Sequence, residues 1–170
     1  MVNLDIFYTN IVLWIQTYVK KPSDVAEGII CIRAQQNSPR PNDELFCVLD
    51  VTNFVQKGRA SIETIDTATN EKRYSYHGTL ILSIDFYGVD ALKSAYTLRA
   101  TMDHELTSSF FDTAGAGVFS VGDVLDITSL KDSRFEERAR FELGMNVVFS
   151  SSEVVEWIES VEINGKTIEI

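Results

Sequence analysis

The chain has 170 residues, of which 45% are hydrophobic and 11% aromatic, and its 25 acidic and 15 basic side chains give a formal net charge of −10. The length suits one compact domain with a single core, and the aromatic content excludes a disordered acidic chain. No apolar run approaches the roughly 20 residues of a membrane span. Residues 1–21 also lack a basic leader and a cleavage site, so we expect a soluble protein made in the cytoplasm.

The charge and the cysteines exclude two further classes. A protein that grips DNA through its phosphates needs a surplus of basic side chains, which this chain does not have, although DNA can still pass alongside it. Cys31 and Cys47 are 16 residues apart and belong to no CxxC pair. We therefore expect neither a zinc site nor a disulfide, but two small buried hydrophobic residues.

Residues 4–20 predict an amphipathic helix, with Asn3 as a candidate cap and Pro22 after its end. One face of that helix collects five large apolar residues: Phe7, Ile11, Trp14, Ile15 and Tyr18. Val12, Leu13 and Val19 widen the apolar surface beyond this face. Part of the helix is therefore expected to be covered by another element or by another subunit.

Two apolar stretches, residues 28–34 and 45–55, are rich in β-branched and aromatic residues and predict strands. The ten residues between them, QQNSPRPNDE, contain two prolines and no apolar side chain. They predict a connection that is extended around Arg40, because a proline disfavours helix in the residue before it.

The middle of the chain predicts strands followed by helix. Residues 60–66 form an imperfect strand pattern, 67–72 a polar turn, and 73–87 a strictly alternating strand with Ser83 and Asp85 on its polar face. Gly88 ends that strand. Residues 89–102 predict a helix whose broad apolar face includes Val89, Leu92, Ala95, Tyr96, Leu98 and Met102, and a second short helical piece is expected up to residue 111.

The last third predicts mainly strands. Residues 112–124 contain three glycines and predict a loop that enters a short strand, and residues 141–149 alternate without fault until a run of three serines is expected to break the strand. Asn164-Gly165 between alternating apolar residues is a strong hairpin signal. We therefore expect one α+β domain over residues 1–170: a mostly antiparallel sheet, an N-terminal and a central helix packed on it, and a C-terminal β arm at 157–170.

The sequence offers little catalytic chemistry. Asp103, His104 and Glu105 are neighbours that point about 100° apart on a helix, so they cannot converge on one ion without partners from elsewhere. There is no Gly-x-Ser-x-Gly elbow and no phosphate-binding loop of the Gly-x-x-x-x-Gly-Lys type. We expect no catalytic residue, no metal site and no cofactor, and hence no enzyme.

Three stretches, in this order, resemble the neck terminator and tail-terminator proteins of tailed phages and prophages. They are residues 34–41 (AQQNSPRP), 82–91 (LSIDFYGVDA) and 117–140 (GVFSVGDVLDITSLKDSRFEERAR). The resemblance spans roughly residues 5–163. Arg40, Phe86, Tyr87, Glu137 and Arg138 match the family pattern by position, and they are expected to be structural or interface residues. Trp157, in the apolar C-terminal segment, is a sixth interface candidate.

The resemblance implies a structural subunit of the virion that assembles into a ring of identical copies, with six as the expected number. Such a ring would stop growth of the tail tube and bind the tube protein on one side. On the other side it would bind a head-completion, adaptor or portal-side neck protein. DNA would pass through the lumen without sequence-specific binding, and no membrane is involved. The basic residues concentrate in the first half of the chain, and acidic residues dominate 101–170. If these acidic residues line the lumen, they would repel the duplex.

Two alternatives remain open from the sequence. One is a non-phage adaptor domain whose acidic C-terminal half contacts a basic protein. The other is an enzyme or metal protein that uses Asp103, His104 and Glu105.

Overall fold

The computed structural model describes residues 4–24, 26–34, 41, 45–66, 71–131, 134–154, 160–163 and 166–169. Arg40, Trp157 and the turn residues 164–165 lie outside the described residues. Most of the 35–44 connection and of the 67–72 turn also lies outside them.

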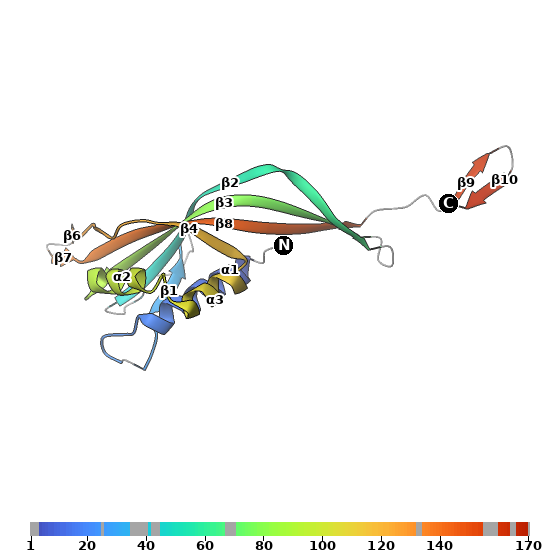
Figure 1. The fold of residues 1–170 in the computed structure, drawn as a ribbon. Helices are drawn as coiled ribbons and strands as arrows, with labels where there is room; N and C mark the ends of the chain where they lie inside the picture. Colours follow the sequence, from blue (N-terminus) through green and yellow to red (C-terminus); the bar gives the residue numbers. More distant parts are fainter. Residues whose placement is uncertain are drawn as a thin grey trace.

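The fold is an α+β arrangement built on one large sheet (Figure 1). Its strand order is β1 (Ile30–Arg33), β2 (Leu45–Asp66), β3 (Glu71–Gly88), β8 (Arg138–Val154) and β4 (Ala116–Val121), and β5 (Leu125–Asp126) also pairs with β8. The pairing is antiparallel except between β1 and β2. Two small sheets complete the described strands: β6 (Ser129–Lys131) with β7 (Arg134–Glu136), and β9 (Ser160–Ile163) with β10 (Lys166–Glu169).

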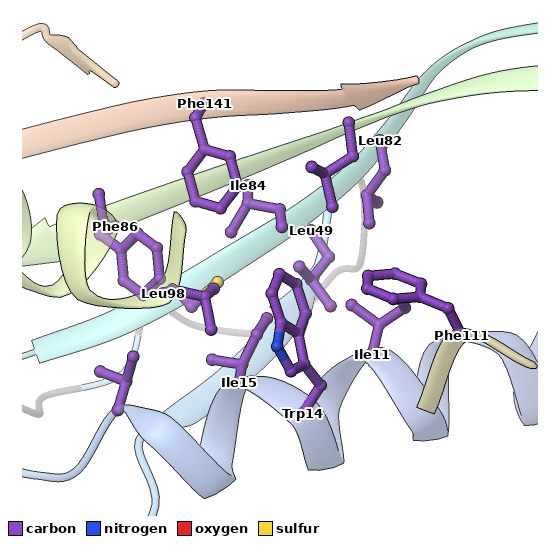
Figure 2. Packing of buried hydrophobic residues seen from close by; sticks show 14 of the residues in the cluster. Ile11, Trp14, Ile15, Leu49, Leu82, Ile84, Phe86, Leu98, Phe111 and Phe141 are labelled. Atoms are coloured by element: carbon purple, nitrogen blue, oxygen red, sulfur yellow. The ribbon is translucent and has the colours of Figure 1, made fainter. Parts of the chain in front are cut away.

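Three helices gather under one end of the large sheet (Figure 1). They are α1 (Leu4–Tyr18), α2 (Ala91–Ala100) and α3 (Glu105–Thr113). The core lies between these helices and the alternate residues of β2, β3 and β8 that face them (Figure 2). Its largest fully buried side chains come from both layers: Trp14, Phe7, Phe86, Phe141, Ile11, Ile15, Ile29, Leu45, Leu49, Leu82, Ile84 and Leu98.

Trp14 joins the three helices at the centre of this core. Its ring lies 5.1 Å from that of Phe111 on α3 (Figure 2). Its Nε1 donates a 3.2 Å hydrogen bond to the Thr101 hydroxyl at the end of α2. The Thr101 hydroxyl itself donates to the Leu98 carbonyl at 2.7 Å. The one polar atom of the buried indole is therefore satisfied, as burial in an apolar core requires.

The long strands continue well beyond the helices as a three-stranded ribbon, which we call the arm: residues 52–66 of β2, 71–79 of β3 and 148–154 of β8 (Figure 1). At a rise of about 3.3 Å per residue, the 22 residues of β2 span about 70 Å. Residues 52–59 of β2 are all exposed. The arm is thus a sheet without a covering layer over much of its length.

The expected elements are confirmed in kind, and the fold class is confirmed. The helix expected at 4–20 is α1, and its buried face contains Phe7, Ile11, Trp14 and Ile15, while Ile6 and Leu13 stay about half exposed. The helix expected at 89–102 is shorter in the structure: α2 covers Ala91–Ala100, so Val89 lies before its first residue. Its buried face is also rotated: Ala91 and Ser94 are inside, whereas Tyr96 is 56% exposed.

Two expected strand ends are wrong. The strands expected at 45–55 and 60–66 are one continuous β2, and β8 runs through residues 150–152 to Val154. In both places pairing with β3 supplies the backbone hydrogen bonds that sustain the strand, so local propensity is overridden. β2 passes Gly58, at φ +76°, through a register shift between Lys57 and Ser61.

The two faces of the β3 strand also differ from the expectation. The alternation predicts that Ser83 and Asp85 face solvent, but both are buried, at 0% and 3% exposed. Short strands β5, β6 and β7 lie at residues 125–126, 129–131 and 134–136, where the sequence pattern predicts no strand.

Candidate assembly interface

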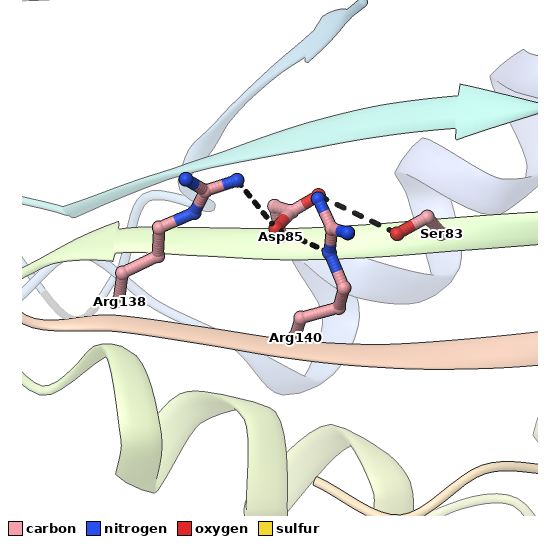
Figure 3. Close-up of polar contacts among 4 residues, drawn as sticks. All are labelled: Ser83, Asp85, Arg138 and Arg140. Carbon is pink, nitrogen blue, oxygen red and sulfur yellow. Dashed lines mark hydrogen bonds and ion pairs between the residues drawn. The ribbon is translucent and has the colours of Figure 1, made fainter. Parts of the chain in front are cut away.

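Asp85 is the centre of a buried charge cluster on the sheet face opposite the helices (Figure 3). Arg140, its cross-strand partner on β8, donates from Nε and Nη2 to the two carboxylate oxygens at 2.8 and 3.0 Å. Arg138 donates from Nη2 to Oδ1 at 3.1 Å. Two guanidinium groups therefore hold one carboxylate, in the paired and charge-assisted geometry that a buried charge requires.

The three side chains of this cluster differ in exposure, which sets their possible roles. The Asp85 side chain is 4% exposed, whereas those of Arg138 and Arg140 are 30% and 36% exposed. The hydrogen bond to Asp85 raises the pKa of Arg140 above its ordinary value. About a third of each arginine side chain remains exposed to solvent.

Aromatic rings extend the cluster toward β2. The Arg138 guanidinium lies over the Tyr87 ring at 4.6 Å from its centroid, and Tyr87 stacks on Phe46 at 5.0 Å with an interplanar angle of 4°. Phe46, Tyr87 and Arg138 are cross-strand neighbours on β2, β3 and β8. Stacking of this kind restricts the tyrosine and arginine side chains to one geometry.

The Glu137 side chain contacts the backbone at the start of α2. Its carboxylate accepts hydrogen bonds from the backbone N–H of Leu92 at 2.8 Å and of Asp90 at 3.2 Å. Asp90, at φ 64°, occupies the N-cap position but makes no side-chain cap bond. A side chain 47 residues downstream therefore caps the helix and ties it to the beginning of β8.

Four of the six candidate residues meet at this end of the sheet. Tyr87, Glu137 and Arg138 are partly buried there, and Phe86 is fully buried on the helix side. Arg40 and Trp157 lie outside the described residues. Whether any of the six contacts another protein stays a prediction.

Sequence reasoning missed two residues, Asp85 and Arg140. Both stand inside the stretches that carry the family resemblance, but the alternation of the strand predicts that Asp85 faces solvent. The signal that finds them is the strand register, which places Asp85 opposite Arg140. Register cannot be read from one strand pattern alone, because it depends on a partner strand 55 residues away.

The β6–β7 hairpin presents the most exposed apolar pair among the described residues. Leu130 and Phe135 are direct cross-strand partners, and they are 65% and 80% exposed. The hairpin lies at the end of the molecule opposite the arm (Figure 1). Leu125, on the adjacent β5, is also more than half exposed. Large apolar side chains concentrated on a protrusion are typical of a contact surface.

Two open grooves flank α1. One, of about 320 Å³, lies between α1 and β1 and is mostly apolar, with Tyr8, Val12, Leu13, Ile32 and Leu49 among its residues. The other, of about 410 Å³, lies between the end of α1 and α2 and contains Lys20, Lys21 and Lys93. In the described part of the chain, no three potential metal-ligating side chains gather. His104 lies at the start of α3, exposed, with its ring against that of Tyr18.

Comparison with known protein families identifies the family of this chain. A family model described as the phage neck terminator protein matches residues 9–170. The chain belongs to the phage neck terminator family. No curated protein matches the chain.

Membership makes this neck terminator a structural phage protein with its place in the virion, at the neck or tail. The non-phage adaptor and the Asp103-His104-Glu105 enzyme are no longer needed to explain the sequence. Across the described residues, no helix has the length and hydropathy to cross a membrane. The Asp85 cluster and the Glu137 cap are both formed by residues of the stretches that carry the family motifs.

Proposed function

We propose that the neck terminator forms a ring of six identical subunits, the number implied by the family resemblance, and that this ring ends the tail tube and joins it to the head. DNA passes through the lumen of this ring. The observation that carries the proposal is the shape of the subunit: a compact body with a long arm on one side and an exposed apolar hairpin on the other. A monomer gains nothing from either feature, whereas a subunit with several neighbours can bury both.

The two ends suit different partners in this proposal. The β6–β7 hairpin, with Leu130 and Phe135, offers a small apolar contact of the kind that anchors a protein interface. The Arg138 and Arg140 guanidinium edges lie on the sheet at the same end of the molecule and can pair with carboxylates. We assign this end to contact with the tail-tube protein or with the head-side neck protein. Arg40 and Trp157 are proposed to contact neighbouring subunits.

Particle mass and imaging test the proposal directly. Purified protein, alone and mixed with the tail-tube protein, is examined by light scattering on a sizing column and by negative-stain microscopy. We expect closed rings with a central hole, or rings on tube ends when the tube is present. A strict monomer under both conditions would exclude a ring-forming terminator.

A matched pair of variants separates the proposed contact surface from the fold. Leu130→Ser with Phe135→Ser removes the exposed apolar pair, and we expect an unchanged melting temperature but at least a tenfold loss of binding to tube or head-side protein. Leu106→Ser is the control, because Leu106 is 51% exposed on α3, outside the hairpin. Equal binding by the double variant and the control would remove this hairpin from the interface.

The ring also allows a test of the charge hypothesis. If acidic residues of 101–170 line the lumen, a reconstruction of the ring will show carboxylates on the channel wall, where they repel the duplex instead of gripping it. A neutral or basic wall, with the acids on the outer surface, would assign the charge of −10 to solubility or docking.

A further inference from the structure

We propose that the β9–β10 hairpin of one subunit adds as extra strands to the free edge of β8, residues 148–154, in the arm of the neighbouring subunit. The inference rests on the proposed assembly into rings and names the contact that closes them. It is carried by a difference between the two edges of the arm and by the isolation of the hairpin.

In the arm the outer edge of β8 is regular, and no strand of the described residues pairs with it. β8 pairs with β5 at residues 139–140 and with β4 at 143–147, and among the described strands none pairs with that edge from Val148 onward. On its other side β8 pairs with β3 from Tyr87–Arg138 to Glu71–Val154 without a register shift. The segment VFSSSEV therefore presents seven residues of evenly spaced backbone groups with one charged side chain and no proline.

The β2 edge of the same arm is different. Its pairing with β3 contains three register shifts, between Val51 and Asn53, Lys57 and Ser61, and Ile62 and Thr64. Lys57 and Arg59 add charge to this strand. Bulges and charged residues on an outer strand are devices that prevent another strand from pairing there. The arm thus has one edge that resists addition and one that accepts it.

The β9–β10 hairpin needs a partner of this kind. Each strand has four residues, and in the described part of the chain the two strands pair only with each other. A two-stranded hairpin of this length is marginal in water and is stabilised by a third strand. Four residues fit within the seven of the β8 edge, and main-chain hydrogen bonds supply the affinity of such an addition.

A neighbouring copy of the chain is the partner that can pair with the β8 edge and the hairpin of every subunit. Each chain carries one acceptor edge and one donor hairpin, so head-to-tail pairing uses both in all copies and leaves none over when the ring closes. Pairing of the hairpin with β8 of its own chain would instead occur in a monomer and would not depend on protein concentration.

Hydrogen exchange of the full chain tests the proposal, read on peptides covering residues 148–154 and 160–169. Assembled rings and the dispersed monomer fraction are compared. We expect both segments to exchange about tenfold or more slowly in rings than in monomers. Protection of both segments already in the monomer would show pairing within one chain. Rings in which residues 148–154 exchange as fast as in the monomer would also overturn the proposal.

Two valines on the same face of the arm give a matched pair of variants. Val148 on β8 and Val55 on β2 are 41% and 49% exposed. Val148→Lys is expected to remove the ring-dependent protection of residues 160–169 and to lower ring yield at least tenfold, whereas Val55→Lys leaves both unchanged. Equal effects of the two variants would contradict an edge-specific contact. A wild-type chain that never forms rings would instead overturn the proposed function itself.

Discussion

Asp85 shows how much of this fold depends on one charged side chain. Its side chain is 4% exposed and is held by two arginines that reach solvent. A buried carboxylate is tolerated only when its charge is matched, and removing one partner from such a group is far more costly than removing an exposed ion pair. The cluster also joins β3 to the beginning of β8, where the family motifs meet.

We predict that Asp85→Ala lowers the free energy of unfolding by about 3 kcal/mol, because it leaves two guanidinium groups facing each other without their shared anion. Urea unfolding followed by circular dichroism measures the change. Asp123→Ala is the control: Asp123 pairs with Arg99 at 3.2 Å, but its side chain is 91% exposed. Little change is expected there, and equal losses in both variants would contradict the importance of burial.

Glu137 gives a second prediction at this scale. Glu137→Ala removes the acceptor of the Leu92 and Asp90 N–H groups and should cost about 1 kcal/mol, as the loss of a helix cap does. Glu137→Gln keeps an acceptor oxygen and should recover part of that loss. The same unfolding experiment measures both, and an Ala variant as stable as the unmodified protein would show that the cap bonds contribute nothing.

The family motifs single out Tyr87, Glu137 and Arg138 as structural or interface candidates, but they do not indicate what each side chain contacts. Asp85 and Arg140 were missed because alternation assigns a polar residue to solvent, whereas the structure buries it under two arginines. Capping by Glu137 likewise depends on a contact between residues that are 45 positions apart. Neither arrangement has a local signal.

Among the elements, the helices and strands were predictable where a long apolar period repeats, and their ends were not. The α1 face and the alternation in β3 and β8 carry such periods, and the core follows them. The continuation of β2 past Gly58 and of β8 through its serines comes from cross-strand bonds to β3. The arm formed by β2, β3 and β8 could therefore not be predicted from the sequence.

The paired strands β1 and β2 make a prediction about the two cysteines. Cys31 and Cys47 are neighbours across this pair and both thiols are free, but Cys31 is partly exposed and Cys47 is buried. Burial raises the pKa of the Cys47 thiol well above its ordinary value, with a smaller contribution from its hydrogen bond with Cys31. A raised pKa lowers the fraction of reactive thiolate at neutral pH.

We therefore expect iodoacetamide at pH 8 to modify Cys31 in the native protein, and Cys47 only after denaturation. Intact and peptide mass spectrometry identify the modified residue. Cys31→Ser should abolish the native adduct. Modification of Cys47 in that variant without denaturant would show that the β1–β2 edge opens readily.

For the whole molecule, charge and shape lead to one description. The subunit has a body in which helices cover one end of the sheet, and an arm that has no use in isolation. Its charge of −10 keeps separate copies soluble, and main-chain pairing at the arm would act over short distances against that repulsion. Assembly should therefore become easier as ionic strength rises, because salt screens the repulsion between copies.

The uninterrupted pairing of β3 with β8 has a consequence for how this chain can change length. Inserting one residue into either strand reverses the two faces of everything beyond it, whereas β2 already absorbs extra residues at its three register shifts. One alanine inserted after Gly58 should leave the melting temperature almost unchanged, and one inserted after Gly78 should lower it sharply. Related chains should accordingly vary in length within β2 and keep the lengths of β3 and β8.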